Sequence, residues 1–131
     1  MHQASQYLSR FENAEVSPDS AGSGSAIDLV HLSRQTLGDS VLENELLSLF
    51  SRQAEHIVGR LSEPVDDRTR VELAHTLKGS ARAVGAFAVA DAAERYESTL
   101  REGERLDGPF ARLAEVAGAA RADIGRLLGR D

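Results

Sequence analysis

One of the four histidines in the chain has neighbours that suit phosphoryl chemistry. It opens the segment His75-Thr76-Leu77-Lys78-Gly79-Ser80. At about 100° per helical residue, His75 lies roughly 150° from the centre of the apolar stripe on its own helix, so it should face solvent. Lys78 and Gly79 follow three and four residues later, which makes them its neighbours on the helix surface.

Each neighbour has a use if His75 carries a phosphoryl group. A histidine near neutral pH is largely an uncharged imidazole, which is a competent nucleophile. Lys78 places a compact positive charge beside the incoming group. Gly79 removes a side chain where a partner must approach, and this explains a helix-interior glycine that costs about 0.5–1 kcal/mol relative to alanine. Ser80 donates a hydrogen bond, to the phosphoryl group or to its own helix. Arg82 lies one turn further along the same side.

The same helix is locally basic, although the whole chain carries a net charge of -6. A local positive face suits a phosphate, whereas the acidic total argues against a nucleic-acid partner. Four cations stand against one carboxylate here: Arg68, Arg70, Lys78 and Arg82 against Glu72.

Apolar residues that recur every three or four positions predict five helices and no strand. On the helix of His75 the stripe is Leu73, Ala74, Leu77, Ala81 and Val84, and on the last helix it is Phe110, Leu113, Ala117, Ile124, Leu127 and Leu128. Caps and breaks bound the helices. The first helix begins after Asp28, runs to Leu37 and stops at Gly38. The second begins at Asp39 or Ser40. The third begins at Asp66 or Asp67 and ends at Gly85, and the fifth begins at Asp107.

Long amphipathic helices with short loops pack as antiparallel neighbours. The expected fold is therefore all-α, an up-down-up-down four-helix bundle with a short additional helix at its N-terminal end. Small and polar residues dominate the end of segment 1–25, which predicts a flexible leader ahead of a bundle over residues 26–131. The starting methionine and this leader favour a freestanding protein.

The hexapeptide, followed by Gly85-Ala86, resembles the signature of histidine-containing phosphotransfer (HPt) domains. The similarity covers about residues 26–102 and is specific in this helical context. Further matching segments are Ile27-Asp28, Leu37-Gly38-Asp39, residues 46–50 and Tyr96-Glu97. One departure is Ala81, where the family often has a second serine; because Ala81 falls on the apolar stripe, we expect a change in packing only.

The resemblance implies a four-helix bundle in which His75 is the phosphorylated residue, with Lys78 and Gly79 around it. HPt domains accept the phosphoryl group from an aspartate of a receiver domain and deliver it to another receiver. They have no ATP site and so no independent ATP-dependent kinase activity. No cofactor is expected in the chain, since the magnesium belongs to the receiver. Gln53 matches a family glutamine that hydrogen-bonds the histidine.

The implied partners are response-regulator receiver domains, including the receiver of a hybrid histidine kinase, and the chain itself is expected to be monomeric. No apolar run approaches the roughly 18 residues of a membrane span, and no signal peptide is visible. The absence of cysteine excludes disulfides and thiolate zinc sites and fits a cytoplasmic location.

Other interpretations have weaker support. Glu72 and His75 match half of a carboxylate-bridged di-iron pattern, but no second pair occurs and His75 points outward, so no metal site is expected. A Ser-His-Asp hydrolase lacks a visible nucleophile turn. His2, His31 and His56 have no comparable surroundings and are expected to be ordinary surface residues. The main alternative is a helical adaptor that docks a receiver or histidine kinase without transferring phosphate; such scaffolds usually lack the accepting histidine.

Overall fold

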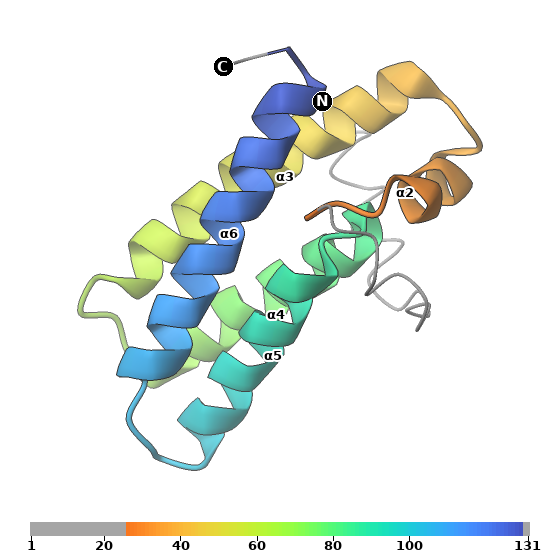
Figure 1. Cartoon of the computed structure of the whole chain (residues 1–131). Helices are drawn as coiled ribbons and strands as arrows, with labels where there is room; N and C mark the ends of the chain where they lie inside the picture. The colour runs from red at the N-terminus through yellow and green to blue at the C-terminus, as the bar shows by residue number, and fades with distance from the viewer. Residues whose placement is uncertain (1–25, 130–131) are drawn as a thin grey trace.

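The computed structural model describes residues 26–129, so the leader predicted over 1–25 lies outside the described residues. Within 26–129 all regular structure is helical, and the four long helices form an antiparallel bundle (Figure 1). The predicted fold class is therefore confirmed. The helices are α2 (Leu29–Thr36), α3 (Ser40–Leu61), α4 (Asp67–Val84), α5 (Phe87–Arg101) and α6 (Asp107–Leu127).

Aspartate caps begin three of the helices where the sequence placed them. Each carboxylate accepts a hydrogen bond from a backbone N–H one turn into the helix, which satisfies a donor that the helix itself leaves unpaired. The caps are Asp28, Asp39 and Asp66, and they accept from His31, Leu42 and Thr69 at 3.0, 3.1 and 2.8 Å. The hydrogen bonds from Thr69 hold the pKa of the Asp66 carboxyl below its usual range.

The predicted stripes form the core with one exception. Ala74, Leu77 and Ala81 of α4 are completely buried, as is Leu113 of α6. Leu127, however, is 44% exposed, so its assignment to the core was wrong. At the end of α6 the side that faces the core passes through Ile124 and Leu128, which are four residues apart. Leu127 therefore lies to one side of it.

α2 is fastened to the turn between α4 and α5. The backbone N–H of Asp28 donates to the carbonyl of Gly85 at 2.9 Å. Gly85 has a φ of 83°, and a Cβ there would lie 2.7 Å from the Asp28 carbonyl oxygen, so both conformation and space require glycine. At its other end, α2 stops one residue earlier than expected, because Leu37 already adopts a left-handed φ of 55° before Gly38.

His31 is buried, contrary to the expectation of an ordinary surface residue. Its side chain is turned into the bundle, and the residue is 8% exposed. The ring meets Phe87 of α5 edge-on, with 5.0 Å between centroids. Aromatic edge-to-face contacts of this kind stabilise packing, and here the contact ties α2 to the start of α5.

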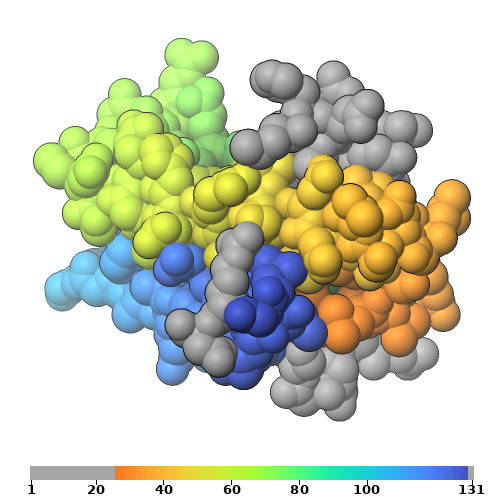
Figure 2. All heavy atoms as spheres, turned by 90° about the horizontal axis from the view of Figure 1, so that it is seen from above, coloured from red at the N-terminus to blue at the C-terminus, as the bar shows by residue number. Residues whose placement is uncertain are grey.

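α4 packs between α3 and α5 and leaves one side of its surface outside the bundle. Seen from above, α3 lies between α4 and α6 (Figure 2). The position of α4 decides which neighbours surround His75: α5 on one flank and α3 on the other. No helix within residues 26–129 has the length and apolar character to cross a membrane.

Candidate functional site

His75 stands on the exposed side of α4. Its side chain is 64% accessible to solvent, as the helical geometry predicted. Ala74, directly before it, and Leu77, two residues after it, are fully buried. The helix backbone is thus anchored in the core, while the imidazole projects to where a partner can reach it.

A buried carboxylate on α5 organises the surroundings of His75. Glu97 is only 2% exposed. Its Oε1 accepts a hydrogen bond from Lys78 Nζ at 3.2 Å, and its Oε2 accepts one from Arg101 Nη2 at 2.6 Å. The Nδ1 atom of His75 lies 3.7 Å from Glu97 Oε2. Two bonded cations compensate the desolvation of the carboxylate, which is the condition under which a buried charge is tolerated.

The contact between Glu97 and His75 affects which ring nitrogen of the imidazole carries the proton. At 3.7 Å it is longer than a hydrogen bond, so it acts as an electrostatic contact. Of the two tautomers of an uncharged imidazole, an anion beside Nδ1 favours the one that carries its proton on that nitrogen. Nε2 then keeps its lone pair and is the nucleophilic atom of the ring.

Lys78 is mostly buried within this cluster, whereas the sequence suggested an exposed cation. Its side chain is 15% exposed and lies against Glu97. The whole basic face expected on α4 is neutralised in this way, because carboxylates of α4 and α5 lie opposite each cation. The remaining pairs are Arg68–Glu72 at 4.0 Å, Arg70–Asp67 at 3.3 Å and Arg82–Glu94 at 3.2 Å.

Gly79 and Ser80 are both buried, so the expectation that position 79 belongs to the open surface was wrong. A glycine has no side chain that reaches past its neighbours, so position 79 presents little surface of its own. Ser80 is 5% exposed and lies on a covered side of α4. Ala81 is fully buried, in line with the packing role expected for it.

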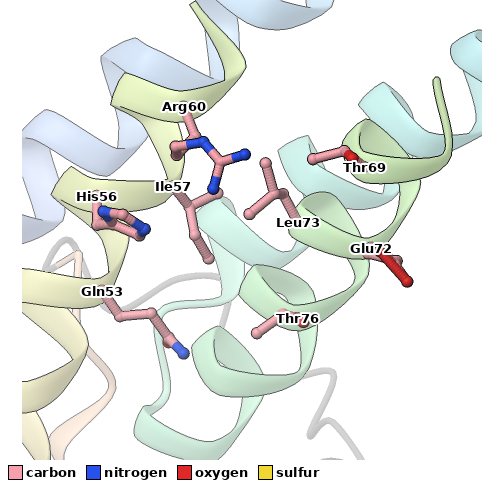
Figure 3. A pocket seen from close by; sticks show the side chains of 8 residues that line it. All are labelled: Gln53, His56, Ile57, Arg60, Thr69, Glu72, Leu73 and Thr76. Atoms are coloured by element: carbon pink, nitrogen blue, oxygen red, sulfur yellow. The ribbon is translucent and has the colours of Figure 1, made fainter. Parts of the chain in front are cut away.

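On the other flank of His75, α3 and α4 border an open recess of about 340 Å³ (Figure 3). Gln53 lies at one end of it, opposite Thr76. The buried Gln53 Oε1 has no hydrogen-bond partner, and no bond joins Gln53 to His75 among the described residues. The structure therefore places Gln53 close to the residue after His75 without the hydrogen bond that the resemblance implied.

Sequence reasoning missed Glu97 and Arg101 as members of the site. One signal was available, since the two residues are four apart on a helix and so form an intrahelical pair. The Tyr96-Glu97 pair was part of the resemblance, but nothing in the sequence placed its carboxylate beside Lys78. Among residues 26–129 no group of three or more metal-ligating side chains lies together.

Fold and site define a class: a helical bundle that presents a histidine on the outer side of a central helix, backed by a buried carboxylate. Comparison with protein families places the chain more narrowly. The model of the Hpt domain family matches residues 45–127, and the chain belongs to this family. No curated protein and no solved structure gives a significant match. Membership assigns the chain to histidine phosphotransfer signalling, in which members of the family interact with receiver domains.

Proposed function

We propose that the protein is a phosphorelay intermediate in which His75 accepts a phosphoryl group from the aspartate of one receiver domain and passes it to another. The observation that carries the proposal is the exposed imidazole of His75 on α4 of an Hpt bundle. In the accepting step, the lone pair of Nε2 attacks the phosphorus of the aspartyl phosphate. The N–P bond forms as the P–O bond breaks, and the aspartate leaves as a carboxylate. Delivery to the second receiver is the reverse of this step.

The cluster on α5 supports both forms of His75. Glu97 stabilises the proton on Nδ1, which matters more once Nε2 carries the phosphoryl group and the ring has gained positive character. Lys78 and Arg101 together outweigh Glu97 by one positive charge. This excess offsets part of the nearly two negative charges that a phosphoryl group brings.

The remaining requirements of the reaction fall on the partner. The chain itself is proposed to need no cofactor, because the magnesium that assists transfer belongs to the receiver. The donor and acceptor are proposed to be response-regulator receivers, one of them the receiver of a hybrid histidine kinase. The Hpt protein is proposed to work as a cytoplasmic monomer and to have no ATP-dependent activity of its own.

A labelling experiment tests the assignment. Each receiver domain encoded in the same genome is purified, phosphorylated with radiolabelled acetyl phosphate and mixed with the full chain. We expect label on the chain that is labile in acid and stable in alkali, as a phosphoramidate is, and its loss in His75→Gln. His2→Gln is the control, since it removes another histidine of the chain and leaves residues 26–129 unchanged.

Label that survives in His75→Gln contradicts the assignment. Receivers that bind tightly but never transfer label point instead to the alternative function, a docking adaptor.

A further inference from the structure

The recess between α3 and α4 has an apolar floor and polar rims. Ile57 and Leu73 face each other across its middle, between Gln53 and Thr76 at one end and Arg60 and Thr69 at the other (Figure 3). His56 and Glu72 complete the lining. An apolar surface surrounded by a few polar groups is typical of a site that receives a side chain of a partner.

The two rims differ in charge. The α3 rim carries the cation Arg60, whereas the α4 rim carries the anion Glu72. Arg60 is 40% exposed, and its Nε lies 3.7 Å from the exposed carboxylate of Glu63, which is a long and solvated pair. A pair of this kind contributes little, so Arg60 can exchange Glu63 for a carboxylate of a partner at small cost.

We propose that this recess is the selectivity pocket for the receiver: it takes an apolar side chain of the receiver, and Arg60 pairs with a carboxylate beside that side chain. The inference rests on the proposed function and adds the surface by which receivers are distinguished. A receiver with a cation at the matching position meets Arg60 unfavourably and is rejected, because like charges across an interface cost more than a missing pair.

Distance from His75 favours a receiver as the occupant. Thr76 follows His75 directly, and Thr69 lies six residues before it, about 9 Å along the helix axis. A protein interface of standard size covers about 800 Å² on each partner, a patch of roughly 16 Å radius. A receiver that brings its aspartate to His75 therefore covers the recess as well.

Gln53 supplies a second reason. Its buried Oε1 lacks a hydrogen-bond partner, and a buried acceptor left unpaired is costly. The amide lies at the end of the recess nearest Thr76. A rotation about the last torsion of the Gln53 side chain turns this oxygen toward the recess. There a donor from a docked receiver satisfies it, so the proposed complex gains a hydrogen bond that the separate chain does not make.

The first test reverses the charge at the rim. The receiver that labels His75 fastest is used at increasing concentrations, and the rate of transfer to the full chain is followed. For Arg60→Glu we expect the half-saturating concentration to rise about three- to tenfold while the maximal rate stays within about twofold, since an exposed pair contributes a few-fold and reversal adds repulsion. The rise should shrink in high salt, because ions screen exposed charges.

Arg112→Glu is the matched control. Arg112 is also an exposed arginine paired with a glutamate three residues later on its helix, but it lies on α6. The two variants change net charge equally, so a general effect of charge moves both. An equal shift in Arg60→Glu and Arg112→Glu overturns the role of Arg60.

The second test fills the recess. Thr69→Trp puts a large side chain over its far end, away from His75, and is expected to raise the half-saturating concentration at least threefold. Ala111→Trp adds the same side chain at an exposed position of α6 and should leave it unchanged. Thermal melting of both variants checks that the bundle is intact.

The outcomes separate this inference from the function on which it depends. If receivers label His75 and both recess variants behave like their controls, the function stands and the pocket assignment falls. If no receiver labels His75 in the wild-type chain, the proposed function falls and this inference falls with it. A receiver variant in which the proposed carboxylate is replaced by arginine should restore the half-saturating concentration of Arg60→Glu to the wild-type value. If no such charge swap restores it, the proposed pairing with Arg60 is wrong.

Discussion

The two flanks of His75 on α4 are built in opposite ways. On the α5 flank, Lys78 and Arg82 each pair with a carboxylate of α5, and the carboxylate paired with Lys78, that of Glu97, is buried. On the α3 flank, Gln53 keeps a buried acceptor without a partner, and an open recess separates the helices. One flank is complete within the chain, whereas the other leaves groups for a partner to satisfy.

This difference assigns a physical task to each flank. A buried carboxylate with bonded cations holds its geometry, because moving any member leaves an unpaired charge. That rigidity keeps His75 and its electrostatic surroundings the same for every receiver. An apolar recess with an unpaired acceptor instead gains free energy only when something docks. Under the proposed function, the α5 flank therefore serves the chemistry and the α3 flank serves recognition.

The largest expected effect comes from removing Glu97. Glu97→Ala leaves Lys78, which is mostly buried, without its partner, and we expect a loss of about 1–3 kcal/mol in the free energy of unfolding. Glu94→Ala removes the solvent-exposed carboxylate that pairs with Arg82 on the same flank and should cost less than about 1 kcal/mol. Urea unfolding of both variants measures the difference. Equal losses would mean that burial of Glu97 does not matter and that the α5 flank is an ordinary surface.

Lys78 should have a smaller effect, seen mainly in transfer. Lys78→Ala leaves Glu97 with Arg101, so the cluster keeps one of its cations. We expect slower phosphoryl transfer by less than about tenfold, since roughly 1.4 kcal/mol is one decade. Lys78→Arg should be milder, because it keeps the charge and changes the shape. The receiver-to-His75 rate at low and high salt measures both, and a wild-type rate for Lys78→Ala at low salt would contradict the electrostatic role.

On the α3 flank the sign of the stability change should reverse. Gln53→Leu removes a buried acceptor that makes no hydrogen bond, so the free energy of unfolding should stay constant or rise by up to about 1 kcal/mol. The same variant should weaken docking of the receiver, because the hydrogen bond formed on binding is lost. Thermal melting and half-saturation of transfer provide the two readings. A marked loss of stability would show that Gln53 already has a partner in the free protein.

The smallest effect concerns Tyr96, the neighbour of Glu97. Burial raises the pKa of its phenol above the ordinary value of 10.0, and nearby Arg70 acts in the opposite direction. Since the folded state holds the phenolic proton more tightly than the unfolded state, Tyr96 contributes fully to stability below pH 10, and the contribution declines as pH rises from there through the folded pKa. Ultraviolet titration should show one of the two tyrosines ionising late, and Tyr96→Phe should remove that phase.

Much of the fold follows from local patterns in the sequence. Caps and three- and four-residue spacing together predicted every helix between residues 26 and 129, and the caps at Asp39 and Asp66 lie where the sequence placed them. These signals act within one helical turn, so the neighbouring residues suffice to read them. The exposure of His75 follows for the same reason, because the apolar stripe of α4 fixes which side of that helix is buried.

What surrounds His75 was decided by tertiary structure. Lys78 meets a carboxylate 19 residues away, and whether it does so depends on how α5 is rotated against α4. Helical periodicity states which face of each helix is buried but leaves open which residues at the edge of that face come opposite one another. The same limit explains why Leu127 was expected in the core, and it left the contact of His31 with Phe87 of α5 unpredicted. Side chains at the border of a stripe are covered or exposed by the neighbouring helix, which their own helix does not specify.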